Sequence, residues 1–313
     1  MSRAAIEAAA ARFADDGRGF VRRTPLWKLP GAAFGVDCRE LWLKLEHLQV
    51  GGSFKARGMY NRLLANPIPA SGVIVASGGN AGIATAAAAR ALGVPCEVFV
   101  PTVSSPAKQT RLRALGAQVV VTGAVYAEAL EACLARQRET GALLTHAYDQ
   151  PEVVAGAGTL AMEIEAQGGA CPDSVLVSVG GGGLIAGVAS WFEGRSRVVA
   201  LEPELAPTLY RAREAGAPVD VAVSGIAADS LGAKRIGAIA WAVAQRHVPQ
   251  ALLLTDAAIR DAQLQLWQEF KLAVEPAAAL PLAALRAGAY VPQANEVVAL
   301  IVCGANVDPA SLG

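Results

Sequence analysis

The chain has few charged side chains and very few histidines. Only 17% of its 313 residues are charged, 27 basic residues balance 27 acidic ones, and no basic run occurs. A neutral chain without a basic patch lacks what nucleic acid or an anionic membrane binds, so neither is expected as a partner. The three histidines, His47, His146 and His247, share no helical face, which argues against a multi-histidine metal centre. We expect each of them to be structural.

Signals for secretion, disulfide bonding and serine hydrolysis are also missing. The five cysteines are odd in number, scattered and without a CxxC pair, which indicates reduced thiols, no zinc site and a cytoplasmic location. No GxSxG elbow occurs. Residues 1–17 carry charges where a signal peptide has an unbroken apolar core. The longest uncharged stretch, residues 174–192, contains four successive glycines and predicts a strand and a helix, not a membrane span.

Short β-branched runs alternate with alanine-rich stretches along the chain, which predicts parallel sheets covered by helices on both faces. Strands are expected at residues 41–45, 73–77, 97–100, 118–121, 143–146, 174–179, 198–201 and 297–302. Helices are expected at residues 81–92, 106–115, 126–139, 153–167, 184–192 and 256–270. Residues 68–147 form a four-strand unit of about domain size. The expected fold class is therefore α/β, with two doubly wound, mostly parallel open-sheet domains that meet at a cleft.

Lys55 lies between glycines, in Gly51-Gly-Ser-Phe-Lys-Ala-Arg-Gly58, directly after the strand expected at residues 41–45. Burial at the mouth of an apolar segment would lower the pKa of its amine and favour the neutral nucleophile, which forms Schiff bases with aldehydes. The alternative is an ordinary surface lysine in a turn.

Two further loops have the character of anion sites. Ser77-Gly-Gly-Asn-Ala-Gly82 precedes a helix, where main-chain amides and the Ser77 and Asn80 side chains suit a carboxylate. An Asn N-cap after a flexible turn is the alternative. Gly180 to Gly183 also lie between a strand and a helix and suit a phosphate.

The glycine loop is compatible with a nicotinamide cofactor as well. Gly181-x-Gly183-x-x-Ala186, with Glu202 at the end of the next strand, fits the dinucleotide fingerprint, which belongs on a protein's first strand. At least four strands are expected before this one. Because loops at the carboxyl ends of parallel strands converge, a reactive lysine, a carboxylate site and a phosphate site instead indicate pyridoxal phosphate bound beside an amino acid.

These motifs, with Arg23-Thr-Pro-Leu26, Gly156-Ala-Gly-Thr159, Glu275-Pro-Ala277 and Cys303-Gly304, extend over nearly the whole chain. The chain resembles the fold-type II pyridoxal-phosphate enzymes of the serine/threonine dehydratase group, closest to the short serine dehydratase-like branch without a regulatory domain. The resemblance implies a tryptophan synthase β-like fold and a homodimer. It also implies a large cofactor-binding domain, residues 1–62 and 148–313, with a small domain, residues 63–147, inserted in it.

The resemblance assigns roles to individual residues. Lys55 would carry the cofactor and remove the substrate Cα proton, with Ser77 as a second catalytic residue. Asn80 would contact the ring hydroxyl, and Cys303 would bond the ring nitrogen. The remaining cofactor contacts would be Phe54, Gly180, Gly181, Gly182 and Gly183, and the substrate carboxylate would be held by Ser77, Asn80 and Ala81.

Three positions bear on the reaction. A neutral thiol at Cys303 leaves the ring nitrogen unprotonated, which disfavours a long-lived carbanion and suits elimination. Gly78 stands where racemases of the family carry a proton-delivering serine, and Ala81 where many threonine deaminases carry histidine. The expected activity is that of a lyase converting L-serine or L-threonine to pyruvate or 2-oxobutanoate plus ammonia by α,β-elimination.

Other activities stay open. Within the family they are those of a serine racemase and a hydroxyaspartate dehydratase, and outside it those of a nicotinamide-dependent oxidoreductase and a non-catalytic ligand-binding protein. The family's cation site would fall on Glu202 and Ala206, but Thr208 stands in place of an aspartate. A monovalent cation, or none, is therefore expected.

Overall fold

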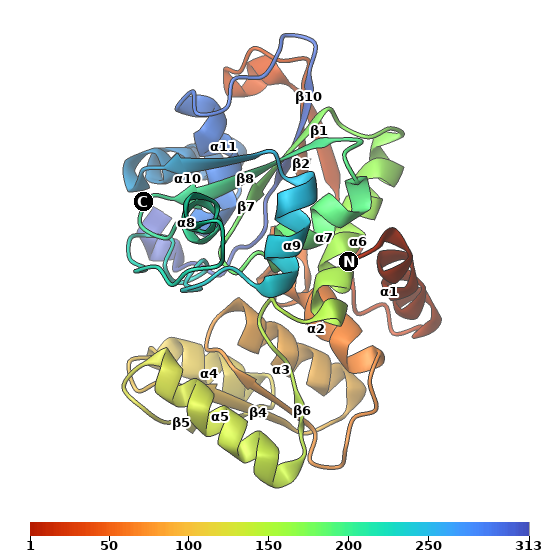
Figure 1. Ribbon diagram of the computed structural model, residues 1–313, viewed down its shortest axis with the longest axis vertical. Coiled ribbons are helices and arrows are strands. Elements are labelled where there is room, and N and C mark those ends of the chain that lie inside the picture. The colour runs from red at the N-terminus through yellow and green to blue at the C-terminus, as the bar shows by residue number, and fades with distance from the viewer. Residues whose placement is uncertain (313) are drawn as a thin grey trace.

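The computed structural model describes residues 1–312 and contains two sheets, each covered by helices (Figure 1). One sheet has six strands in the order β1-β2-β10-β7-β8-β9, and the other has four in the order β5-β4-β3-β6. Strands β1 and β2 are antiparallel, and all other neighbours are parallel. The expected α/β class with two mostly parallel sheets is confirmed.

The six-stranded sheet forms the core of the upper part of Figure 1. Its strands are β1 (Leu26–Pro30), β2 (Glu40–Lys44), β7 (Ser174–Ser178), β8 (Arg197–Pro203), β9 (Gln250–Leu254) and β10 (Val297–Ile301). The helices around it are α1 (Arg3–Asp15), α6 (Pro151–Gly168), α7 (Gly183–Phe192), α8 (Thr208–Ala215), α9 (Ala238–His247), α10 (Asp256–Phe270) and α11 (Pro276–Arg286). Helices α10 and α11 lie on one side of the sheet and α6, α7 and α9 on the other. All residues of β7 and β10 are buried, because helices cover both faces.

The four-stranded sheet lies in the lower part of Figure 1. It consists of β3 (Val73–Ala76), β4 (Cys96–Val100), β5 (Gln118–Val121) and β6 (Leu143–Leu144), with helices α2 (Lys55–Leu64), α3 (Asn80–Leu92), α4 (Pro106–Ala114) and α5 (Tyr126–Thr140). Val73 and Val75 pack with α2, α3 and α4, whereas Ile74 packs with α5 on the opposite face. Successive strand residues point to opposite faces, so a continuous apolar run marks a strand buried on both.

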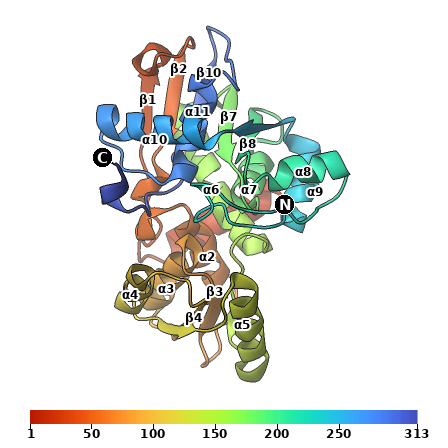
Figure 2. The same ribbon diagram turned by 90° about the vertical axis from the view of Figure 1, so that its left-hand side faces the viewer.

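Helix α2 lies where the two parts meet and packs against both α3 and α6 (Figure 2). The chain leaves the larger sheet through α2 and returns through residues 145–150, between β6 and α6. The domain boundaries at residues 62/63 and 147/148 stay a prediction, and the first of them falls inside α2. None of the helices in residues 1–312 combines the length and the apolar character needed to cross a membrane.

The expected elements all occur, with ends that differ by up to two residues, but seven other α-helices and strands were not expected: α1, β1, α2, α8, α9, β9 and α11. Helix α11 carries Pro281 in its interior, where proline removes a hydrogen bond, and nine of its eleven residues are buried. A helix that is apolar all round shows no amphipathic period, so sequence periodicity cannot find it.

Candidate functional site

The Lys55 loop is joined to the segment that follows β10. The main-chain N–H of Phe54 donates to the Cys303 carbonyl at 3.0 Å, and that of Ala305 donates to the Gly52 carbonyl at 2.8 Å. Residues about 250 positions apart in the sequence therefore lie side by side, and the structure brings Lys55, Phe54 and Cys303 together.

The Lys55 amine is enclosed at this junction. Its Nζ donates to the carbonyl of Ala147 and lies 5.1 Å from the ring centroid of Phe54. Burial lowers the pKa of Lys55 to about 8, although the acidic groups of Cys303 and Glu275 oppose the shift. A sizeable fraction of the amine is therefore neutral near pH 8, which is the form that attacks an aldehyde.

The asparagine loop, residues 77–82, leads from the carboxyl end of β3 into helix α3. The Ser77 Oγ accepts from the Gly79 N–H at 3.3 Å, and Ala81 is buried in the first turn. The leading N–H groups of a helix have no partner within it, so this turn suits an anion. Asn80 Nδ2 donates to both Glu275 carboxylate oxygens, at 2.9 and 3.0 Å, a contact that the sequence did not reveal.

The glycine loop closes against an aromatic ring. Helix α7 begins at Gly183 after Gly182, whose φ of 87° lies in the left-handed region that favours glycine. A Cβ on Gly181 would lie 2.2 Å from the Tyr148 ring, so that ring packs directly on the loop. Tyr148 follows Ala147, which accepts from Lys55, and this short segment connects the lysine to the glycine loop. Sequence reasoning missed Tyr148 because no motif marks it.

Cys303 is 2% exposed, and burial, followed by the nearby Glu275 carboxylate, raises its thiol pKa well above the usual value. The thiol is therefore neutral at physiological pH, as the electronic argument requires. His146 has a structural role, because its Nδ1 accepts from the N–H groups of Tyr148 and Asp149.

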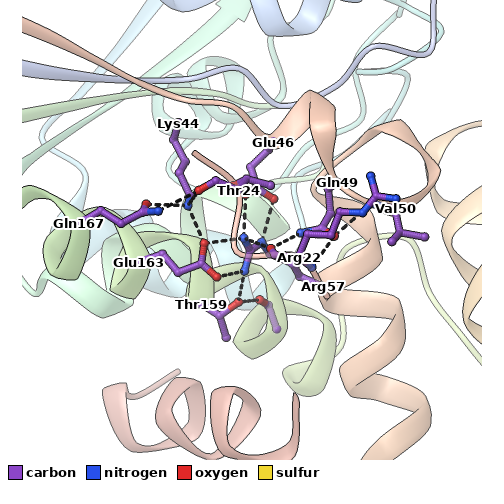
Figure 3. Close-up of polar contacts among 11 residues, drawn as sticks. Arg22, Thr24, Lys44, Glu46, Gln49, Val50, Arg57, Thr159, Glu163 and Gln167 are labelled. Atoms are coloured by element: carbon purple, nitrogen blue, oxygen red, sulfur yellow. Dashed lines mark hydrogen bonds and ion pairs between the residues drawn. The ribbon is translucent and has the colours of Figure 1, made fainter. Parts of the chain in front are cut away.

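A buried ion network anchors α2 through Arg57, two residues after Lys55 in the sequence (Figure 3). Arg57, which is fully buried, donates to Glu46 at 2.7 and 2.8 Å and to Glu163 at 2.8 Å through two of its nitrogens. Lys44 donates to the same Glu163 at 2.5 Å, and Thr24 donates to Glu46. Two cations thus balance two carboxylates, and the motif residues Thr24, Arg57 and Thr159 share one network.

Glu202, an expected cation ligand, is bonded to α8. Its oxygens accept from the main-chain N–H groups of Leu209 at 2.7 Å and Tyr210 at 2.8 Å, and the Thr208 hydroxyl lies 3.0 Å away. Burial raises the pKa of Glu202 to about 7, opposed by these hydrogen bonds. Within residues 1–312, no group of three or more histidine, cysteine, aspartate or glutamate side chains is arranged to hold a metal ion.

The assembled groups fit pyridoxal phosphate. Lys55 offers an enclosed amine for the aldehyde, the glycine-bounded start of α7 offers N–H groups for the phosphate, and Cys303 offers a neutral thiol for the ring nitrogen. The family model described as "Pyridoxal-phosphate dependent enzyme" matches residues 18–304. The chain belongs to this family.

Relatives within the family act on several amino acids, according to their names. The chain is 34% identical to an L-threonine ammonia-lyase of Thermotoga maritima, over 86% of this chain and 68% of that one. It is 34% identical to a phenylserine dehydratase of Ralstonia pickettii, over 93% and 90%. The crystal structure of a T.th. threonine deaminase matches with a TM-score of 0.90 and 36% identity, over 98% and 99%. Other relatives carry the names beta-hydroxyaspartate dehydratase and serine racemase.

Proposed function

We propose that this pyridoxal-phosphate-dependent lyase is a dehydratase of β-hydroxy amino acids, with L-serine or L-threonine as the substrate. The observation that carries the proposal is the pairing of an enclosed Lys55 amine with a neutral Cys303 thiol at one junction. Threonine ammonia-lyases and dehydratases among the relatives support the same reaction type.

Each residue has a defined task in this proposal. Bound pyridoxal phosphate would supply the electron sink that acidifies the substrate Cα–H bond. Lys55 takes the Cα proton, the C–H electron pair becomes the Cα=Cβ bond, and the Cβ–O bond breaks so that hydroxide leaves and is protonated to water. The released enamine tautomerises and is hydrolysed to the 2-oxo acid and ammonia, so one water leaves and one returns. Ser77, Asn80 and Ala81 hold the carboxylate through the first turn of α3.

The neutral thiol of Cys303 favours elimination over racemisation. A carboxylate at this position would keep the ring nitrogen protonated and lengthen the life of a carbanion, whereas a thiol of raised pKa does not. Gly78 adds no hydroxyl that could return a proton to the opposite face. These two positions make serine racemase the weaker candidate for this chain.

The test is a product analysis of the purified protein. Loaded with cofactor, it should be yellow, and borohydride should leave a modified peptide containing Lys55. L-serine should give pyruvate and ammonia in equal amounts with little D-serine. Abundant D-serine would contradict the dehydratase proposal, and a colourless protein that binds NAD would contradict the cofactor as well. Parallel assays with threonine, hydroxyaspartate and phenylserine rank the substrates.

Three further parts of the proposal concern its setting. We propose that the protein is a cytoplasmic homodimer, and light scattering tests the dimer. We also propose that residues 63–147 form the small domain, which limited proteolysis tests. A monovalent cation at Glu202 and Ala206 would have to compete with the N–H donors that already face the carboxylate. Equal activity in potassium and in a bulky organic cation would contradict that site.

A further inference from the structure

Glu275 is an enclosed carboxylate beside Lys55 that has no role in the reaction described above. It is 3% exposed and occupies the N-cap position of α11, where its side chain makes no capping hydrogen bond. Its oxygens accept from Asn80 Nδ2 at 2.9 and 3.0 Å, and the nearby main-chain N–H of Asn306 favours its charged form. Both oxygens therefore act as acceptors, and the groups that favour the carboxylate come from α3 of the smaller sheet and from the segment after β10.

The amide of Asn80 is held at both of its ends. While Nδ2 donates to Glu275, Oδ1 accepts from Asn306 Nδ2 at 2.5 Å. Asn306 Nδ2 also lies 2.9 Å from the Gly51 carbonyl, and Asn306 Oδ1 accepts from Arg111 of α4 at 2.6 Å. This bridge connects α3 and α4 to the loop that carries Lys55.

Two glycines of the sequence motifs leave room for the bridge. A Cβ on Gly304 would lie 2.4 Å from Glu275 Oε1, and a Cβ on Gly52 would lie 2.8 Å from Asn306 Oδ1. Real Cβ contacts of that length do not occur without displacement, so larger residues at either position would push the bridge out of place. Gly304, beside Cys303, is thus explained by packing against Glu275, whereas Gly52 has a φ of 78° that already favours glycine and also packs against Asn306.

The chemistry of the partners permits only one orientation of the Asn80 amide. If the amide were flipped, its oxygen would face a carboxylate and its NH2 would face the NH2 of Asn306, and both pairings are repulsive. We propose that Glu275 is a positioning residue that fixes the Asn80 amide, and with it the first turn of α3, against the Lys55 site. The inference rests on the proposed function for the role of Asn80 in cofactor and substrate binding.

The charge state of Glu275 matters to this role. The titratable groups that face it are Lys55 from α2, Cys303 after β10 and Asp229 from the segment before α9. Burial raises its pKa to about 7, opposed by the Asn80 and Asn306 hydrogen bonds. A proton on either oxygen would turn an acceptor into a donor and break one of the two contacts. The bridge should therefore weaken as the pH falls below 7.

A double-mutant cycle tests the inference, with cofactor affinity as the readout. Fluorescence titration of the apoprotein with pyridoxal phosphate is carried out for Glu275→Gln, Asn80→Ala and the double variant. One buried hydrogen bond to a charged group is worth about 10- to 100-fold in affinity, so each single variant should bind more weakly by roughly that factor. The double variant should bind no more weakly than the poorer single variant. Multiplied losses would overturn the inference.

A second link between the same two parts provides the control. Lys108 of α4 and Asp229 are 2.6 Å apart, with side chains 36% and 76% exposed, and an exposed pair of this kind contributes little. Lys108→Ala should change the affinity less than twofold and combine multiplicatively with Asn80→Ala. If Lys108→Ala lost as much cofactor affinity as Glu275→Gln, breaking any link between the two parts would weaken cofactor binding. That result would overturn the specific role of Glu275.

The pH dependence adds an independent readout. Protonation of Lys55, whose pKa is about 8, should lower the affinity of both proteins as the pH falls. The wild type should show a further fall through pH 7 that Glu275→Gln lacks. An unchanged profile in the variant would overturn the inference. If Glu275→Gln does not fold, Asn306→Ala takes its place in the cycle, with the same expected coupling to Asn80. Because no substrate is present, a failure of the dehydratase proposal leaves these results unaffected.

Discussion

Removal of the Arg57 guanidinium is the most demanding test of the buried ion network. Arg57→Met keeps most of the aliphatic stem but deletes four hydrogen bonds of 2.7 to 2.8 Å to Glu46 and Glu163. Glu163 is 19% exposed and keeps Lys44 as a partner, whereas the side chain of Glu46 is fully buried and keeps only the Thr24 hydroxyl as a short-range partner. The cost of the substitution should therefore fall mainly on Glu46.

The size of that cost depends mainly on proton uptake. In the wild type, burial acts to raise the pKa of Glu46, but Arg57 outweighs burial and holds it below the usual value of 4.5. Without Arg57, only Lys44 and the Thr24 hydroxyl still oppose the effect of burial on the Glu46 pKa, and we expect the carboxyl to take up a proton. Keeping it neutral at pH 7 costs about 1.36 kcal/mol for each of 2.5 pH units, or roughly 3.4 kcal/mol. Adding lost hydrogen bonds, we expect a destabilisation of about 3–5 kcal/mol, as for other broken buried pairs.

The sign of the pH dependence follows from the same reasoning. The depressed pKa of Glu46 in the wild type adds stability above the usual pKa, and this is lost as the pH falls. In Arg57→Met the raised pKa removes stability as the pH rises above 4.5. The gap between the two proteins should therefore widen by about 1.4 kcal/mol per pH unit, or roughly 2.7 kcal/mol between pH 5 and 7.

Urea unfolding of the apoproteins, followed by circular dichroism at pH 5, 6 and 7, measures this gap. Arg136→Met serves as the matched control, because it deletes an ion pair between Arg136 and Glu97, with side chains that are 39% and 17% exposed. Loss of this exposed pair should cost no more than about 1 kcal/mol of unfolding free energy at any pH. Equal midpoints for Arg57→Met and the wild type, or a gap that does not change with pH, would refute the reasoning.

Substitutions at four other positions provide further tests. Lys55→Ala should abolish elimination with the circular dichroism spectrum unchanged, and wild-type turnover of serine, threonine and hydroxyaspartate would contradict its assignment. Gly78→Ser should raise D-serine relative to pyruvate in chiral analysis, because the new hydroxyl can return a proton to the opposite face. A serine fits there, since Gly78 does not have a left-handed φ and a Cβ would lie 3.1 Å from Ser104 Oγ, a tight but adjustable contact. Cys303→Ser should be nearly silent, whereas Cys303→Asp should slow elimination and raise side reactions, and equal losses would point to packing. The raised pKa of Glu202 adds stability below pH 4.5 that is lost as the pH rises to 7, so Glu202→Gln should remove about 3 kcal/mol of pH dependence from the unfolding free energy.

The loops and most of the strands could be predicted because their signals are local. A buried parallel strand such as Val73–Ala76 appears in the sequence as a continuous apolar run, and Gly180 to Gly183 can only connect a strand to a helix through a turn. Helix α11 was not predicted, because a helix buried on all sides lacks the alternation of apolar and polar residues that marks a helix in the sequence. Strand β1 was not predicted, because it forms through antiparallel pairing with β2, which its own residues do not reveal.

The candidate site divides in the same way. Lys55, Asn80, the four glycines and Cys303 stand in short motifs whose residue types suggest their chemistry, and the family follows from those motifs. Contacts between distant segments were not visible in the sequence. They are the hydrogen bond of Glu275 to Asn80 across 195 positions, the packing of Tyr148 on Gly181, and the bridge of Arg57 between Glu46 and Glu163. The pKa values near 8 for Lys55 and near 7 for Glu275 likewise arise from burial. Sequence alone determines which groups the chain carries and where the backbone turns, whereas only folding determines which groups lose water and which become neighbours, because both depend on the packing of the whole chain.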